Sequence, residues 1–368
     1  MSKRVYLDWN ATTPLRPEAR AAMIAAMDVV GNPSSVHGEG RAAKAIVERA
    51  RVQVGTLVGV RPADVVFTGG ATEAAHLILN ATPWAGIAAS DTEHDCILAN
   101  IPAEKRSILS SDNLGYAELG TPYHDLCAVS AANSETGVCN DLGRFVGVVG
   151  GDIICDITQA TGKIEIPPEV VGPLPSSGVR YLILSAHKFG GPKGVGAAIL
   201  RGGSELHVIQ GGGQEMGRRA GTENVVGIAG FGAAAEAAQR DLEAGVWGEV
   251  EKLRNILEKA IAAATDQTIF VGKDANRLPN TSCFATPGWK GETQVMAMDL
   301  AGFAISAGSA CSSGKVKESR VLRAMGYDDI TARSAVRVSL GPTTTLEEIE
   351  RFADAWIAAH RKFRARAA

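Results

Sequence analysis

One lysine and one aspartate follow separate apolar runs, where a cofactor could bind between them. Lys188 stands in the glycine-rich stretch SAHKFGGPKG directly after the run RYLIL, and Asp156 ends the run GDIICD. Ligands of an open parallel sheet bind outside the carboxyl ends of its strands, so both side chains are expected at that edge. Each alone fits a plain role, as a surface lysine or a turn cap. Together they indicate pyridoxal phosphate chemistry, in which a lysine forms a Schiff base and a carboxylate keeps the ring nitrogen protonated.

Two glycine-rich turns are candidates for holding the phosphate of such a cofactor. VVFTGGATEAAHLIL predicts a strand, a Gly-Gly turn and a helix that begins near Ala71 and Thr72, whose backbone N–H groups and hydroxyl suit a dianion. The alternative is an ordinary helix start with Glu73 in its first turn. Thr222, in GGGQEMGRRAGTEN, is the second candidate, and a surface turn fits it equally well.

His94 follows the run GIAAS and is therefore expected near the same edge of the sheet. It fits either a structural histidine with satisfied hydrogen bonds or an aromatic plate that stacks on the cofactor ring and moves protons. The other motifs favour the second interpretation.

Cys311 is set apart from the other cysteines by its surroundings. It lies in SAGSACSSGK among Gly, Ser and Ala. Five others lie in apolar stretches and are expected to pack as small hydrophobic residues: Cys96, Cys127, Cys139, Cys155 and Cys283. The sequence contains no C-x-x-C pair, so neither a zinc site nor a disulfide framework is predicted. We expect no metal, and free thiols in a reducing compartment.

The elements that must position these residues form an α/β fold. Ala-rich stretches predict helices from Pro17 to Val30 and from Gly38 to Val58. Between residues 64 and 200, short apolar runs alternate with helix-like segments, which predicts a mostly parallel, doubly wound sheet with helices on both faces. Helices and strands, NTSCFAT and SAVRVSL among them, follow in a smaller α+β domain. We predict a large domain of residues 14–245 and a small domain of residues 1–13 and 246–368, which carries the Cys311 loop.

Composition and charge argue against several classes of partner. The chain has 368 residues and a formal net charge of -3, so no basic surface for nucleic acid or an anionic membrane is expected. No apolar run reaches the length of a membrane span, and the start MSKRVYLDWNATTP lacks the apolar region of a secretory signal. We therefore expect a cytoplasmic protein that acts on small molecules.

Motifs along nearly the whole chain resemble those of one enzyme family. In order they are VYLDWNATTP, GNPSSVHGEGR, VVFTGGATEA, DTEH, NSETG, DITQATGK, SAHKFGGPKG, GGGQEMGRRAGTEN, SAGSACSSGK and VRVSLG. Their combination is very specific. The chain is similar to the NifS/IscS-type cysteine desulfurases, in the class V aminotransferase group of fold-type I pyridoxal phosphate enzymes.

The resemblance implies a role for each candidate residue. Lys188 would bind pyridoxal 5'-phosphate covalently, and Asp156 would pair with its pyridine nitrogen. Gln159 would hydrogen-bond the ring oxygen, and His94 would stack on the ring. The phosphate ligands are expected to be Ala71, Thr72, Ser185, His187 and, from the neighbouring subunit of a homodimer, Thr222.

The resemblance also implies the substrate and the fate of its sulfur. Arg337, in SAVRVSLG, would grip the carboxylate of L-cysteine, and Lys188 would move the α-proton. The Cys311 thiolate would then attack the substrate sulfur, which leaves a persulfide on Cys311 and releases L-alanine. The loop between Cys311 and Val321 has the long form, which implies delivery to a separate acceptor or scaffold protein for iron-sulfur clusters or thio-cofactors.

Two positions depart from the family pattern. Ser134 replaces the second of two consecutive asparagines, so a shorter hydroxyl is expected beside the cofactor and the substrate carboxylate, and Pro342 stands where relatives often have arginine. Two other functions stay open: a selenocysteine lyase or other β-eliminating pyridoxal phosphate enzyme, and an inert scaffold that mainly binds partners. The lyase is favoured if selenocysteine is turned over far better and Cys311→Ala keeps that activity. The scaffold is excluded if the purified protein shows the absorbance of the bound cofactor and turns over L-cysteine.

Overall fold

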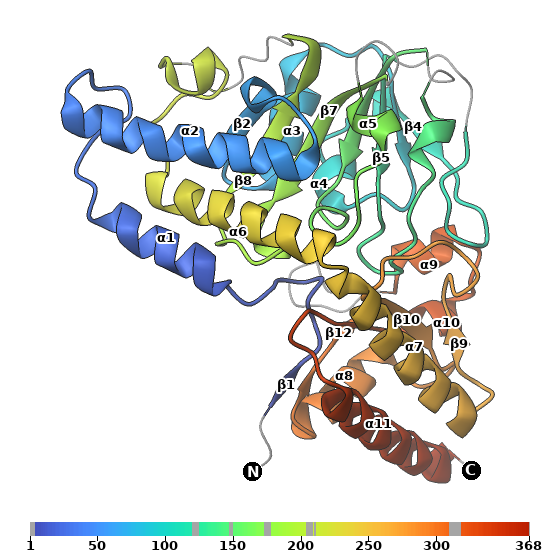
Figure 1. Ribbon diagram of the computed structural model, residues 1–368. Coiled ribbons are helices and arrows are strands. Elements are labelled where there is room, and N and C mark those ends of the chain that lie inside the picture. Colours follow the sequence, from blue (N-terminus) through green and yellow to red (C-terminus); the bar gives the residue numbers. More distant parts are fainter. Residues whose placement is uncertain are drawn as a thin grey trace.

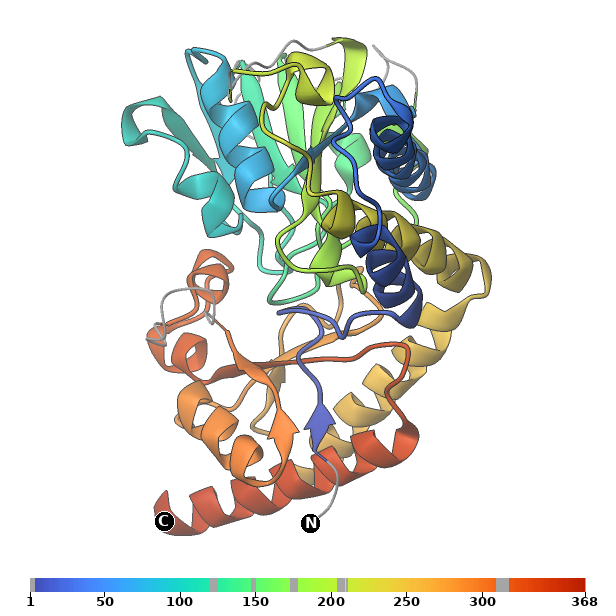
Figure 2. The same ribbon diagram turned by 90° about the vertical axis from the view of Figure 1, so that its left-hand side faces the viewer.

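The computed structural model describes residues 4–119, 125–146, 150–172, 178–203, 209, 211–308 and 318–367. A larger part contains a seven-stranded sheet, and a smaller part below it contains both chain ends (Figure 1). The chain enters through β1 (Val5–Tyr6) in the smaller part and then crosses to the larger one (Figure 2). In the described part of the chain, no helix combines the length and apolar character that a membrane span requires.

The central sheet is mostly parallel and doubly wound, which confirms the predicted fold class. Within the described residues, β8 alone runs antiparallel to its neighbours β2 and β7. β2, β3, β5 and β8 are buried along their whole length, as expected for strands covered on both faces. The strand order is β2 (Val65–Thr68), β8 (Gly196–Leu200), β7 (Val179–Ser185), β6 (Asp152–Asp156), β5 (Leu126–Ser130), β3 (Ile87–Ser90) and β4 (Arg106–Leu109).

Helices cover both faces of this sheet, each over its own hydrophobic core. One core lies under α1 (Pro17–Met27), α2 (Gly38–Val58) and α6 (Val225–Glu243), which lie side by side in Figure 1. The other lies under α3 (Ala71–Ala81) and α4 (Asp95–Leu98), with Trp84 packed against Tyr181. A further short helix is α5 (Pro168–Val171).

The predicted helix boundaries hold at α2 and fail at the end of α1. α2 ends at Val58 because Gly59 takes the left-handed conformation with φ 83°. α1 ends at Met27 instead of Val30, and Val30 is exposed. Short 3-10 turns complete the larger part: η1 (Pro62–Asp64), η2 (Ala103–Lys105), η3 (Leu142–Arg144), η4 (Ala186–Lys188), η5 (Arg201–Gly203) and η6 (Gln214–Gly217).

The smaller part packs helices on two small sheets. β1 pairs in parallel with β11 (Phe303–Ala304), and an antiparallel sheet has the order β12 (Ser306–Ala307), β13 (Ala335–Ser339), β10 (Thr281–Ala285) and β9 (Ile269–Phe270). The helices are α7 (Val246–Ala264), α8 (Gly291–Leu300), α9 (Arg320–Ala324), α10 (Asp329–Arg333) and α11 (Leu346–Ala367).

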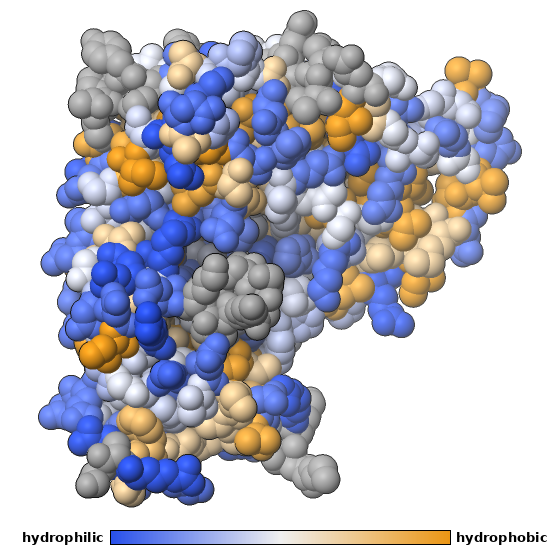
Figure 3. Space-filling model, turned by 180° about the vertical axis from the view of Figure 1, so that it is seen from behind, coloured by the Kyte–Doolittle hydropathy of each residue, from blue (hydrophilic) through white to orange (hydrophobic). Residues whose placement is uncertain are grey.

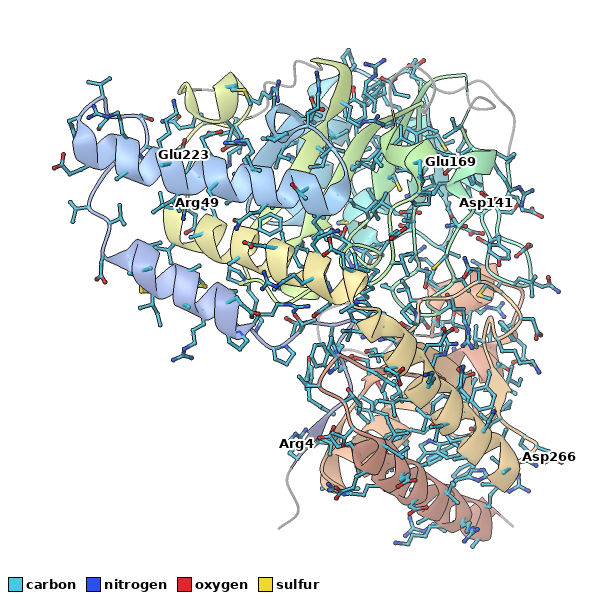
Figure 4. The ribbon with its side chains drawn as sticks, in the orientation of Figure 1. Arg4, Arg49, Asp141, Glu169, Glu223 and Asp266 are labelled. Carbon is cyan, nitrogen blue, oxygen red and sulfur yellow. The ribbon has the colours of Figure 1, made fainter. Side chains whose placement is uncertain are left out.

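A third core lies between α7, α8 and α11 and is rich in aromatic residues. Trp356 contacts Phe284 edge-to-face and Trp289 at a tilt. Arg4, labelled beside β1 in Figure 4, forms an ion pair with Asp299 at the end of α8. The N-terminal strand therefore packs with the C-terminal elements. This arrangement supports the predicted division near residue 245, which stays a prediction.

Candidate active site

A cavity of about 330 Å³ lies at the carboxyl ends of the parallel strands, against Arg337 of the smaller part. Seen from behind, the region between the two parts is mainly hydrophilic (Figure 3). The predicted site residues that line the cavity are Ala71, Thr72, His94, Ser134, Asp156, Gln159, Ser185, His187, Lys188 and Arg337. The topology thus brings together residues that are far apart in the sequence.

Lys188 ends η4, directly after β7, and its side chain is held by the N-terminal segment. Its Nζ donates to the backbone oxygens of Asn10, at 2.7 Å, and Ala11, at 2.9 Å. Thr13 also binds this turn, because its N–H and hydroxyl both donate to the backbone oxygen of His187 at 2.9 Å. The segment that leaves β1 therefore closes over the lysine and fixes the position of its amine in the cavity.

Asp156 is the last residue of β6, Gln159 lies in the turn that follows, and both line the cavity. Oδ1 of Asp156 accepts the Thr158 N–H at 2.8 Å, which orients the carboxylate. Nε2 of Gln159 donates to the Asn10 backbone oxygen at 3.0 Å. Its Oε1 accepts from Nζ of Lys163 at 2.7 Å, and both side chains are buried. The amide of Gln159 is therefore held at both ends.

The start of α3 forms an anion cradle with β7. Gly70 precedes the helix with φ 149°, a conformation that glycine adopts easily. Having no side chain, it leaves the N–H groups of the first turn without the usual cap. The Ala71 N–H donates to Oγ of Ser185 at 2.8 Å. A Cβ on Gly196 would lie 2.7 Å from Cα of Gly70, so only glycine lets β8 approach this turn. Backbone N–H groups at a helix start favour a phosphate.

His94 is both a helix cap and a cavity residue. Its Nδ1 accepts the Cys96 N–H at 3.1 Å, so a proton on the neutral ring belongs on Nε2. The neighbouring Glu93 is buried, and its carboxylate accepts from both the N–H and the hydroxyl of Ser130, at 2.6 and 2.5 Å. Burial is the main cause that raises the pKa of Glu93 to about 7, and the nearby Asp156 adds to it.

His187 faces the same cradle in a neutral form. Burial, followed by the charges of Lys188 and Lys193, lowers its pKa to about 4. Its Nδ1 lies 3.0 Å from Oγ1 of Thr12, which fixes the ring. A neutral imidazole can donate one hydrogen bond to an anion without adding a charge.

Arg337 reaches the cavity from β13 and is almost fully buried. One terminal nitrogen donates to Oδ1 of Asp8 at 2.7 Å, and the other donates to the backbone oxygen of Ser134 at 3.0 Å. Its Nε is buried and has no hydrogen-bond partner among the described residues. Because Arg337 lines the cavity, its guanidinium is suited to a carboxylate ligand.

The described cysteines are poor candidates for a nucleophile. Cys96, Cys127, Cys139, Cys155 and Cys283 are all buried and free. Burial is the main cause that raises the pKa of each thiol, for Cys127 and Cys139 to about 12. A thiol is reactive as its thiolate, which a raised pKa disfavours. Cys311 lies outside the described residues.

Thr222 does not line the cavity and is exposed. Its segment is anchored by Glu215, whose carboxylate binds the buried guanidinium of Arg51 at 2.7 and 3.0 Å and accepts the Phe67 N–H at 2.9 Å. The role predicted for Thr222 in a neighbouring subunit stays a prediction.

Sequence reasoning misses several residues of the site. Asn10, Lys163, Glu93 and Asp8 received no role, although each lies inside a motif: LDWNATTP, DITQATGK or DTEH. The motif letters are the signal that could have found them. Asn10 binds Gln159 and Lys188 through its backbone oxygen and Lys163 through its side chain.

The residues present fit pyridoxal 5'-phosphate. The cradle of α3 and Ser185 suits a phosphate, Asp156 suits a protonated ring nitrogen, and Lys188 supplies an amine in the same cavity. An acidic group, an amine and an anion cradle match the three polar ends of this cofactor.

The chain matches the family described as Aminotransferase class-V over residues 5–352. A cysteine desulfurase of Cereibacter sphaeroides is 39% identical over 374 residues, which cover 95% of this chain and 94% of that protein. The solved structure of a NifS-like protein from Rickettsia africae is similar with a TM-score of 0.88 and 30% identity, over 97% of this chain and 99% of that one. SspA, solved in complex with cysteine, has a TM-score of 0.75 and 25% identity, over 93% of this chain and 100% of that one.

These similarities extend over nearly the whole chain, as the sequence motifs do. They confirm the resemblance that the motifs indicate. The chain belongs to the aminotransferase class-V family and, within it, to the cysteine desulfurases.

Proposed function

We propose that this cysteine desulfurase holds pyridoxal 5'-phosphate on Lys188 and moves the sulfur of L-cysteine to Cys311. The observation that carries the proposal is the convergence of Lys188, Asp156 and the partly unsatisfied Arg337 on one cavity. When bound, the cofactor would withdraw electrons from the α-carbon of the substrate. The residues around it supply binding, orientation and proton transfer.

Residues from several elements would hold the cofactor. Asp156 is fixed by the Thr158 N–H and would accept from the ring nitrogen. The second N–H of Gln159 would donate to the ring oxygen, because the first is bound to Asn10. His94, with its ring fixed by the Cys96 N–H, would stack on the ring. The phosphate would lie on the start of α3, beside Ser185, His187 and, across a subunit interface, Thr222.

Arg337 would bind the substrate carboxylate. Asp8 and the Ser134 backbone oxygen hold the guanidinium in place, and its Nε faces no other acceptor among the described residues. Ser134 lines the cavity beside it. The solved complex of SspA with cysteine supports an amino acid substrate of this kind.

Lys188 would take and return the α-proton, because its Nζ is held by two backbone oxygens at the cavity wall. The Cys311 thiolate would attack the substrate sulfur. A new S–S bond forms, the C–S bond breaks, and its electron pair remains on the carbon, which gains a proton to give L-alanine. The raised pKa values of the described cysteines support Cys311 as the nucleophile.

The working unit would be a homodimer that passes sulfur to an acceptor protein in the cytoplasm. Apolar side chains project from α1 and the turn that follows it, with Val30 82% and Val36 88% exposed. Monomers rarely expose such groups together, which supports a subunit contact near this end of the molecule. The apolar colour on the projecting arm in Figure 3 lies in the same region.

The first test is incubation of the purified protein with L-cysteine without reductant, followed by peptide mass spectrometry. We expect the Cys311 peptide to gain one sulfur atom. Cys311→Ala should still bind the cofactor but release alanine far more slowly, and Lys188→Ala should lose turnover. Cys127→Ala, which removes a thiol from the sheet core, is the matched control.

Two results would redirect the proposal. Unchanged alanine release by Cys311→Ala, with faster turnover of selenocysteine, would favour a lyase. A protein that binds no cofactor and turns over no cysteine would favour a partner-binding scaffold.

A further inference from the structure

A buried lysine lies directly behind the predicted cofactor site and has no role in the mechanism above. Lys163 follows β6 in the same turn as Gln159 and is 2% exposed. It does not line the cavity. An amine in such a place loses its hydration and therefore needs strong protein partners.

Two side-chain oxygens accept hydrogen bonds from Lys163. Its Nζ donates to Oε1 of Gln159 at 2.7 Å and to Oδ1 of Asn10 at 3.2 Å. Burial, followed by the charges of Lys188 and Arg337, lowers the pKa of Lys163. A neutral amine still has two N–H groups, so both oxygens can be served in either protonation state.

The contacts with Asn10 and Lys163 together decide how the Gln159 amide lies. Nε2 faces the Asn10 backbone oxygen, which can only accept, so Oε1 must face Lys163. With both ends held, the remaining N–H of Gln159 is directed away from Asn10, in a side chain that lines the cavity. Without Lys163, Oε1 would be a buried acceptor without this donor, and the amide could rotate.

We propose that Lys163 is a positioning residue that fixes the Gln159 amide so that its free N–H meets the ring oxygen of pyridoxal 5'-phosphate. The inference rests on the proposed function, because the cofactor site is part of it. Lys163 itself would touch neither cofactor nor substrate and would act only through Gln159 and Asn10.

The test is a double-mutant cycle on the full-length protein, with titration of pyridoxal 5'-phosphate followed by visible absorbance. Lys163→Met keeps the length and removes the donor. We expect it to weaken cofactor affinity about three- to tenfold, the worth of one net hydrogen bond. In a Gln159→Ala background the same change should alter affinity less than about twofold, because the group it positions is gone.

A second readout separates positioning from general damage. A hydrogen bond to the ring oxygen changes the absorption band of the bound cofactor, so Lys163→Met and Gln159→Ala should move the band in the same direction. Thr161→Val is the matched control. It removes a buried hydrogen bond, from Oγ1 to the Ile157 backbone oxygen at 2.8 Å, in the same turn. It should leave affinity and band unchanged.

Each outcome decides one claim. An equal loss of affinity for Lys163→Met in both backgrounds would overturn the positioning role, as would an unchanged band. If Lys163→Met does not fold, Lys163→Gln replaces it in the same double-mutant cycle. Because Gln keeps an N–H donor, the loss of cofactor affinity should be below the about three- to tenfold expected for Lys163→Met, and an equal loss in both backgrounds would again overturn the positioning role. Failure of the wild-type protein to bind the cofactor would instead reject the proposed function.

Discussion

Glu93 offers a test of the electrostatics beneath the site. Its side chain is 1% exposed, and its carboxylate is bonded only to neutral donors of Ser130 among the bonds described above. Burial raises its pKa from 4.5 to about 7, with a contribution from Asp156. The folded protein therefore binds this proton more tightly than the unfolded chain does. The associated stability is complete below pH 4.5 and is lost as the pH rises through about 7.

Glu93→Gln removes this titration and keeps the hydrogen bonds. The amide oxygen can accept the Ser130 N–H, and the amide nitrogen can donate to the Ser130 hydroxyl. A shift of about 2.5 pH units at about 1.4 kcal/mol each is worth about 3 kcal/mol in total. About 0.8 kcal/mol of it is already lost at pH 5, so the variant should gain about 2.5 kcal/mol over the wild type between pH 5 and 9.

The assay is urea unfolding of both proteins at several pH values across that range. The difference between the two curves isolates Glu93, because the other groups titrate in both proteins. Glu104→Gln is the control, since this substitution makes the same chemical change at an exposed residue of the turn η2. A Glu93→Gln difference that changes by less than about 1 kcal/mol from pH 5 to 9 would refute the reasoning.

Three further substitutions test contacts that position the site. Asp8→Asn should raise KM for L-cysteine about tenfold with a smaller change in kcat, because Arg337 loses a hydrogen bond to a charged acceptor. An unchanged KM would show that Asp8 does not contribute to substrate binding. Glu215→Gln should lower the unfolding free energy by about 3 kcal/mol, since the buried Arg51 loses its buried charge partner and keeps only the half-exposed Glu48. A loss below about 1 kcal/mol would contradict this. Gly196→Ala should cost about 2 kcal/mol in urea unfolding, because its Cβ would lie 2.4 and 2.7 Å from backbone atoms; wild-type stability would show that the strands can separate there.

The sequence predicts those parts of the fold that produce a local pattern of apolar residues. β6 and β7 are continuous apolar runs, so their ends, with Asp156 and Lys188, could be placed at one edge of a sheet. β4 could not be predicted, because Arg106 and Ile108 are exposed on an edge strand without an apolar run. α6 is rich in glycine, which weakens a helix pattern even where the glycines pack against other elements.

The site shows the same limit more sharply. Lys163 stands in a recognisable motif, but a lysine in a turn is expected at the surface, and only the fold shows that it is buried behind Gln159. The pair of Asp8 and Arg337 joins residues 329 positions apart in the sequence. Neither contact leaves a periodic or compositional signal, because the first depends on the burial of a turn and the second joins two segments that are distant in the sequence.

Asn10 connects the packing between the two parts of the molecule to the function of the site. Its backbone oxygen binds Lys188 and Gln159 of the larger part, and its side chain binds Asn280 and Thr281 of the smaller part. A residue with its polar atoms shared in this way ties the position of the catalytic amine to the packing between the two parts. The residues that hold the two parts together therefore also set the geometry of the site. A substitution that weakens this contact should displace the amine of Lys188 before it disturbs the packing of either hydrophobic core.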